Sequence, residues 1–201
     1  SDGYQNRVIV YPIASADAAI NTTGDNSSLY SLIAGGPNAN ELNRFNECEM
    51  GVLVYLDMNI NVTYNVFNLC KLACQLQSIK NGNIIFKNNS IDRFSYGIAL
   101  WDVFANATVL IKQNLFNQGL TYDFDNYGKK AISLQNYTLQ GAYYDISENT
   151  IANCEKGIHL RNISANIAGP AGTAGLSVKG NLIETMIPNI DLINPHYGIW
   201  I

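Results

Sequence analysis

The sequence predicts an all-β fold, a solenoid of about six stacked coils built from short strands. One observation is an asparagine that recurs along the chain and is followed two positions later by an apolar residue. A second is the pair of alternating apolar stretches that flank most of these asparagines, as in strands with one buried face. A third is the spacing of the first copies, which stays near about 24 residues and is typical of repeat architectures. The asparagines are Asn43, Asn65, Asn89, Asn114, Asn149 and Asn181.

A small residue opens the strand that follows each asparagine. It comes eight positions later in four copies and 17 positions later in the other two. The two longer copies therefore carry nine extra residues, in the turns 117–130 and 184–197, as a stacked array tolerates. The small residues are Gly51, Ala73, Gly97, Ala131, Gly157 and Gly198. The inward positions hold Val52, Cys74, Ile98, Ile132, Ile158 and Ile199, then Val54, Leu76, Leu100, Leu134, Leu160 and Ile201.

Another alternating strand precedes the asparagine in five copies, as in Ile84 and Phe86 before Asn89. The copy at Asn43 is expected to lack it, because residues 36–42 read GPNANEL. One coil cannot bury its own apolar face, whereas stacked coils form a continuous core. Asparagine side chains then lie above one another and are expected to form a ladder of amides between coils. A β-sandwich or an irregular asparagine-rich β protein is the alternative.

Residues 1–41 do not follow the repeat. Val8–Tyr11 is expected to form a strand that Pro12 ends, and residues 21–28 and 35–40 are expected to form loops. We therefore divide the chain into an irregular N-terminal segment or degenerate coil, 1–41, and a β-helix, 42–201. The last residues fall within a core strand, so we expect a piece of a longer chain with flanking domains.

Composition excludes some classes of function. The net charge is −4, and the 12 lysines and arginines form no run, which argues against a nucleic-acid partner. No apolar stretch is long enough to span a membrane. The 27 asparagines suit turns and a hydrogen-bonding surface. No Cys/His spacing matches a zinc site, so no metal is expected.

The four cysteines leave one question open. Cys74 occupies an inward column and is expected to be a buried thiol. Cys48, Cys70 and Cys154 each lie five residues after their asparagine, at equivalent turns. Because Cys48 and Cys70 fall in adjacent coils, their Cα atoms are expected within disulfide range. The alternative is a column of small apolar turn residues, with Phe94 as its next member.

Several stretches resemble repeats of the pectin-lyase-like right-handed parallel β-helix superfamily. They are GIAL (97–100), GIHL (157–160), VLIKQNLF (109–116) and YDISENTI (144–151), and the resemblance covers about 42–201. It implies a right-handed parallel β-helix with three sheets, in a secreted or cell-surface protein. Many members of this superfamily bind, cleave or isomerise polysaccharides, whereas others are tailspikes, adhesins or surface proteins.

The outward positions of the strand opened by the small residue are the candidate binding surface. In the superfamily, the outer face of this sheet and its loops commonly form the glycan cleft. The resemblance therefore implies substrate-binding roles here for Tyr55, Trp101, His159 and Arg161. Aromatic rings stack on sugar faces, and guanidinium groups bind hydroxyls and carboxylates. The alternative is an ordinary solvated sheet face.

Catalytic signatures are scarcer. The acidic candidates are Asp102, Asp123 and Asp125, since glycoside hydrolysis needs two carboxylates at one bond. The segment YDFDNYG also fits a loop-stabilising turn or a calcium site. Paired-Asp and Gly-His-Gly motifs of the polygalacturonase kind are missing, so no catalytic residue is assigned and no cofactor is expected. We expect a non-catalytic structural or glycan-binding domain of an adhesin-like extracellular or cell-surface protein. The alternative is a polysaccharide lyase or glycoside hydrolase whose catalytic residues lie partly outside this chain.

Overall fold

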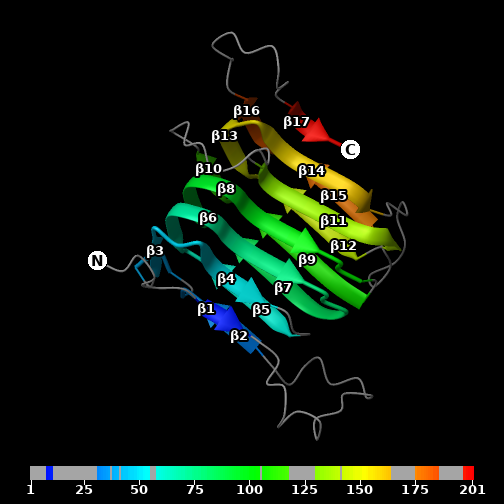
Figure 1. Ribbon diagram of the computed structural model, residues 1–201, viewed down its shortest axis with the longest axis horizontal. Helices are drawn as coiled ribbons and strands as arrows, with labels where there is room; N and C mark the ends of the chain where they lie inside the picture. Colours follow the sequence, from blue (N-terminus) through cyan, green and yellow to red (C-terminus); the bar gives the residue numbers. More distant parts are fainter. Residues whose placement is uncertain are drawn as a thin grey trace, which may run out of the picture.

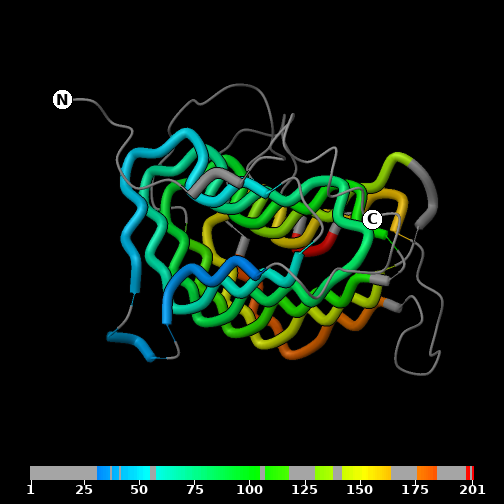
Figure 2. Tube along the Cα trace, turned by 90° about the horizontal axis from the view of Figure 1, so that it is seen from below, coloured from blue at the N-terminus to red at the C-terminus, as the bar shows by residue number. Residues whose placement is uncertain are grey.

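The computed structural model describes residues 8–10, 31–36, 38–40, 42–54, 58–104, 106–117, 130–140, 142–163, 175–185 and 197–201. Over these ranges the chain is all β, with no helix, and every strand pairing is parallel. Figure 1 shows the strands side by side, in an order that follows the sequence. Figure 2, seen from the side of the first strands, shows the chain winding through successive turns of similar outline. This arrangement is compatible with a parallel β-helix.

The strands form three columns, which the chain visits in the same order in each turn. The first and second columns belong to one 11-stranded sheet, and the third is a 6-stranded sheet. The first column contains β3 (Arg44–Asn46), the beginnings of β6 (Val66–Gln77) and β8 (Ser90–Trp101), β10 (Leu115–Asn117), β13 (Thr150–Cys154) and β16 (Leu182–Thr185). The second contains β1 (Val8–Val10), β4 (Met50–Val54), the ends of β6 and β8, β11 (Lys130–Gln140), β14 (Lys156–Ile163) and β17 (Tyr197–Trp200). The third contains β2 (Ser31–Ala34), β5 (Asn59–Thr63), β7 (Asn81–Lys87), β9 (Asn106–Lys112), β12 (Tyr143–Ser147) and β15 (Gly175–Lys179).

The predicted inward columns are in register from turn to turn. Ile98 pairs with Cys74 on one side and with Ile132 on the other, and Leu100 pairs with Leu76 and Leu134. These side chains are buried in one continuous apolar core. Each burial removes apolar surface from water, which stabilises the fold by about 25 cal/mol per Å². The alternation read from the sequence is therefore confirmed from Val52 to Leu160, whereas Ile199 and Ile201, which were also expected to be inward, are 47% and 91% exposed.

The asparagine ladder is also confirmed. Asn89 and Asn114 are buried, and the Oδ1 of each accepts hydrogen bonds from the backbone and the side chain of the preceding asparagine. Each Nδ2 also donates to a backbone carbonyl of the preceding turn, as Asn89 does to Val62 at 2.8 Å. The same pattern continues to Asn149 and Asn181. The ladder therefore satisfies buried amides at one corner of every turn.

Left-handed backbone marks the corners between columns. The residue before each ladder asparagine from Asn65 to Asn181 has a positive φ, as in Tyr64 (54°) and Gln113 (55°). In the turns at Asn43, Asn65, Asn89 and Asn149, the residue four positions after the asparagine also has a positive φ, as in Leu69 (56°) and Arg93 (54°). The third corner has Asp102 at 55°. Non-glycine residues adopt this conformation at a cost, which the surrounding hydrogen bonds must offset.

The N-terminal part of the chain corrects one expectation. We expected the copy at Asn43 to lack its preceding strand, but β2 occupies that place and pairs with β5 from Leu32↔Ile60 to Ala34↔Val62. The stretch 35–42 intervenes between β2 and Asn43 and so obscures the spacing in the sequence. β1 covers Val8–Val10, within the strand expected at 8–11, and pairs with β4. The division of the chain at residue 41 stays a prediction.

Candidate functional site

Three rows of side chains run across the outer face of the second column, with their members in register from strand to strand. We name them the lysine row, the middle row and the tryptophan row. The lysine row is Met50, Leu72, Tyr96, Lys130 and Lys156. The middle row is Leu53, Gln75, Ala99, Ser133 and His159. The tryptophan row is Gln77, Trp101, Gln135 and Arg161.

The middle row is polar towards its C-terminal end and is buried. His159 is 5% exposed, so this predicted binding residue is not the accessible side chain that its outward position indicated. Its Nδ1 lies 3.3 Å from the Ser133 Oγ, and the Gln135 Nε2 donates to that oxygen at 2.8 Å. Burial, together with the charges of Lys130, Lys156 and Arg161, lowers the pKa of His159 to about 4. His159 is therefore neutral at physiological pH.

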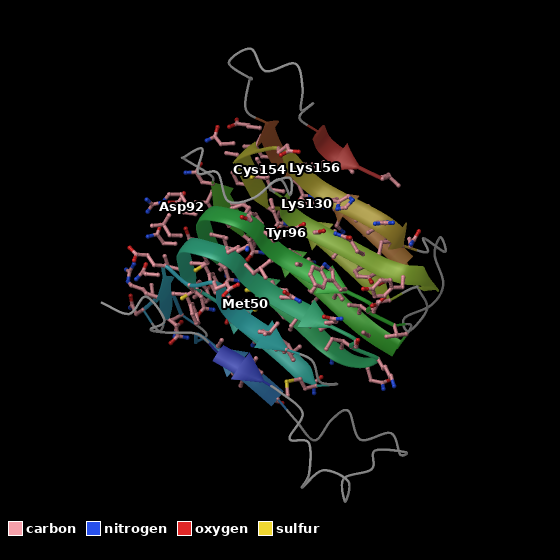
Figure 3. All side chains as sticks on the ribbon, in the orientation of Figure 1. Met50, Asp92, Tyr96, Lys130, Cys154 and Lys156 are labelled. Carbon is pink, nitrogen blue, oxygen red and sulfur yellow. The ribbon has the colours of Figure 1, made fainter. Side chains whose placement is uncertain are left out.

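Lys130 is the unusual member of the lysine row. Its side chain is only 9% exposed, and its Nζ lies 5.3 Å from the centre of the Tyr96 ring, within cation–π range. Figure 3 labels Met50, Tyr96, Lys130 and Lys156, which follow one another across the strands of this face. Burial lowers the pKa of Lys130 to about 8, and the charges of Lys156 and Arg161 act in the same direction.

Positive charge concentrates here although the chain is acidic overall. The pKa of His159 is lowered by the charges of Lys130, Lys156 and Arg161, so these three positive charges lie around the same side chain. Glu155 is the carboxylate that partly offsets the charge at Lys130. Within the described ranges, no carboxylate lies at ion-pair distance from the Lys130 ammonium. A buried cation without a counter-ion is unfavourable, and a bound anion would relieve it.

Trp101 lies between Gln77 and Gln135 in the tryptophan row. The ring is half-buried, and its Nε1 is buried with no hydrogen-bond acceptor among the residues that the structure places. A buried indole N–H normally has a partner, so this donor is an exception within the described part of the chain. Arg161, the register neighbour of Gln135 on the next strand, is exposed. The structure thus brings Trp101, His159 and Arg161 onto one face.

The acidic candidates do not form a pair over the described part of this face. Asp102 lies at the third corner, where its Oδ1 accepts the backbone N–H of Tyr137 at 2.8 Å. This contact gives Asp102 a structural role in joining two turns. Tyr55, Asp123 and Asp125 lie outside the described residues, as does most of the long turns 117–130 and 184–197.

The Ser133–His159 contact does not make a competent nucleophile. Ser133 is fully buried, its Oγ already accepts from Gln135, and a histidine with a pKa of about 4 is a poor base at neutral pH. The pair instead helps to position Gln135 within the tryptophan row, because Ser133 accepts a hydrogen bond from it. Among the described residues, no three His, Cys, Asp or Glu side chains gather in a way that could hold a metal ion.

Sequence reasoning missed Lys130 and Lys156. Lys130 and Lys156 directly precede the small residues Ala131 and Gly157, so a search of that position in every copy would have found the row. Comparison with protein-family models, curated proteins and solved structures finds no match. No helix over the described residues is long and apolar enough to cross a membrane.

Proposed function

We propose that the chain is a right-handed parallel β-helix of about six coils, of the pectin-lyase-like class, within a secreted or cell-surface protein. Three features support this assignment. All pairings are parallel, the chain visits three strand columns in a fixed order, and an asparagine ladder joins the turns. The stretches GIAL and GIHL both fall at the small-residue end of the second column, in β8 and β14. These are the positions that carry the resemblance.

We further propose that the domain binds an anionic glycan across the outer face of the second column. The observation that carries this proposal is the nearly buried Lys130 ammonium, which has no carboxylate partner in the described chain. A carboxylate or sulfate group on a sugar would supply the missing counter-ion. Lys156 and Arg161 would add charge-assisted hydrogen bonds to the same group.

The tryptophan row would hold the sugar rings. The half-buried Trp101 offers an aromatic face for stacking. Gln77 and Gln135, its register neighbours, carry planar amides suited to sugar hydroxyls. Successive members of one row come from neighbouring strands and are therefore about 4.8 Å apart. A chain of sugars that follows a row would lie across several strands.

A second candidate function is a polysaccharide lyase, and the lowered pKa of Lys130 favours it. A neutral amine near physiological pH is able to remove a proton next to a carboxylate group. On this hypothesis the rest of the catalytic residues lie partly outside the chain. The first hypothesis, binding without catalysis, requires no further groups and is the one we adopt. A glycoside hydrolase is less favoured, because it needs two facing carboxylates.

Glycan-array screening tests the binding proposal, with wild type and Trp101→Ala compared over neutral, uronate-containing and sulfated glycans. We expect wild type to select acidic glycans and Trp101→Ala to lose about tenfold or more of the affinity, with unchanged melting. Tyr137→Ala is the matched control, because Tyr137 is an aromatic residue 84% exposed beyond the corner at Asp102. No glycan bound by wild type, or equal binding by wild type and Trp101→Ala, would refute the proposal.

The lyase hypothesis has a separate readout. Incubation of wild type with the selected glycan, followed by ultraviolet absorbance, detects the unsaturated sugar that elimination produces. Binding without any rise in absorbance supports the non-catalytic function. A rise that Lys130→Gln abolishes supports the lyase.

A further inference from the structure

Two of the four cysteines lie one above the other at the corner between the first and second columns. Before this corner Asn46 pairs with Asn68, and after it Met50 pairs with Leu72. Paired residues of the two turns are therefore separated by the same number of positions in the sequence on both sides of the corner. No residue is inserted between these pairs, and Cys48 therefore stacks directly on Cys70. The backbone ladder continues through the corner, where the Lys71 N–H donates to the Cys48 carbonyl at 2.9 Å.

This stacking satisfies the first requirement of a disulfide. Neighbouring parallel strands lie about 4.8 Å apart. Disulfides join Cα atoms that are about 4.4–6.8 Å apart. The Cβ atoms must also approach to about 3.8 Å, which needs a small local adjustment. The backbone at this corner already departs from regular strand geometry at Glu47 and Leu69, so the adjustment does not have to break a regular strand.

The two thiols share one buried environment. Cys48 and Cys70 are 4% and 1% exposed, and their thiol groups are hydrogen-bond neighbours. Each thiol also donates weakly to a nearby carbonyl, Cys48 to Asn46 and Cys70 to Phe45, both at 3.4 Å. These weak bonds hold both sulfur atoms on the inner side of the corner, facing the same space.

The other two cysteines have different neighbours. Cys74 lies between Val52 and Ile98 in the apolar core. Cys154 occupies the equivalent corner position several turns later and pairs with Thr185. Phe94 continues the column above Cys70. Of the four cysteines, Cys48 and Cys70 are thus the pair that stacks. Cys74 and Cys154 serve as internal controls.

We propose that Cys48 and Cys70 form an intramolecular disulfide when the chain folds under oxidising conditions, joining the turn that begins at Asn43 to the next one. The oxidant is a disulfide such as oxidised glutathione; in the bacterial periplasm the disulfide of an oxidoreductase takes the same part. One cysteine thiolate attacks it, releases a glutathione thiol and forms a mixed disulfide. The other cysteine attacks the protein sulfur of that mixed disulfide and releases the second glutathione thiol. Two protein thiols are thereby oxidised while one glutathione disulfide is reduced to two thiols.

The bond must form during folding rather than after it. Burial is the main reason that the pKa of Cys70 rises to about 12, so the folded protein holds almost no thiolate at this position. Oxidising compartments are also where such bonds persist, in keeping with the proposed extracellular location.

Expression of the chain in the bacterial periplasm and in the cytosol tests this proposal. Both folded preparations are denatured in N-ethylmaleimide and digested with trypsin. Trypsin leaves Cys48 and Cys70 together in the peptide 45–71, Cys74 in 72–80 and Cys154 in 131–156. We expect the periplasmic 45–71 peptide to be unalkylated and lighter by two hydrogen atoms than its reduced form. Further cleavage before Asp57 should leave its two halves joined.

Serine variants and melting temperatures complete the test. Cys48→Ser should leave Cys70 fully alkylated, whereas Cys154→Ser should leave the bond intact. The periplasmic wild type should melt roughly 5 °C or more above the cytosolic form, and Cys48→Ser should abolish this difference. Folded periplasmic protein with both thiols alkylated would overturn the proposal. Bonding of either cysteine to Cys74 or Cys154, or misfolding that Cys48→Ser corrects, would do the same.

Discussion

The Nδ2 of Asn89 donates to the Oδ1 of Asn114 in the next turn at 3.0 Å, and the Asn89 backbone N–H donates to the same oxygen at 3.0 Å. One side chain thus receives two hydrogen bonds from the turn before it and passes the pattern on to Asn149. An aspartate would lack the donor and repel its neighbours. A serine is too short to reach both partners. The repeated asparagine is therefore explained by hydrogen-bond chemistry at a buried corner.

Asn89→Ala should destabilise the fold, because the backbone N–H of Asn65 and the carbonyl of Val62 lose their partners in a buried site. We expect the free energy of unfolding to fall by about 1–3 kcal/mol, measured by urea denaturation. Asn83→Ala is the matched control, since that side chain is exposed in the third column. Equal stability of the two variants would contradict the role of the ladder.

Gly97→Ala should also destabilise the chain. A Cβ at Gly97 would lie 2.5 Å from the Ala131 carbonyl oxygen and 2.8 Å from the Phe116 ring, so backbone must move. We expect a loss of about 1–3 kcal/mol in urea denaturation. Gly198, at the equivalent position, has its nearest atom 3.8 Å away, and Gly198→Ala should change stability little. A tolerated Gly97→Ala would show that the turns separate easily.

Lys112→Met should leave the buried carboxylate of Asp145, in the third column, without its ion-pair partner. The Lys112 Nζ lies 2.7 Å from Asp145, whose side chain is buried. Burial alone would raise the pKa of Asp145, but the hydrogen bond and charge of Lys112 outweigh it, and the pKa is lowered. The pair therefore stabilises the fold at neutral pH, and this contribution is lost as acid protonates Asp145.

We expect Lys112→Met to lower the free energy of unfolding by about 1–3 kcal/mol at pH 7. The gap to wild type should narrow in acid. Urea denaturation of wild type and variant at pH 7 and in acid measures this difference in the free energy of unfolding. Lys87→Met is the control, because Lys87 is the exposed register neighbour of Lys112. A gap that stays constant with pH would contradict the assignment.

Binding of an acidic glycan should weaken above about pH 8. Burial lowers the pKa of Lys130 to about 8, so the ammonium that would face the anion is lost as the pH rises through this value. We expect the affinity to fall roughly tenfold between pH 7 and pH 9, as measured by calorimetry. Lys130→Arg keeps its charge over this range and should remove most of the dependence. An unchanged slope in Lys130→Arg would assign the titration to another group.

Periodic features of the fold could be predicted from the sequence because stacking imposes like residues on equivalent positions. The ladder asparagines, the inward columns at Ile98 and Leu100 and the small residues such as Gly97 all follow this rule. β2 was missed, since the stretch 35–42 separates it from Asn43. The corners at Tyr64, Leu69 and Arg93 carry no recognisable turn residue, because hydrogen bonds between turns hold their left-handed backbone.

The candidate site could be predicted only in part, because outward positions are free to differ from turn to turn. Alternation gave the outward positions of Trp101 and Arg161, and the resemblance implied their binding role. The burial of His159 was not predicted, since alternation separates inward from outward side chains and does not measure exposure. Lys130 and Lys156 hold equivalent positions before the small residues Ala131 and Gly157, and the structure pairs them in register. The burial of Lys130 is a three-dimensional property that the repeat does not indicate.

Calorimetric titration with one glycan in two chemical forms tests the binding proposal most directly. The forms are a uronate oligosaccharide selected on the array and the same oligosaccharide with its carboxylates reduced to alcohols. We predict that wild type binds the acidic form at least about tenfold more tightly, and that Lys130→Gln loses most of this preference and keeps only what Lys156 and Arg161 supply. Equal affinity of wild type for the two forms would contradict the anion site on the outer face of the second column.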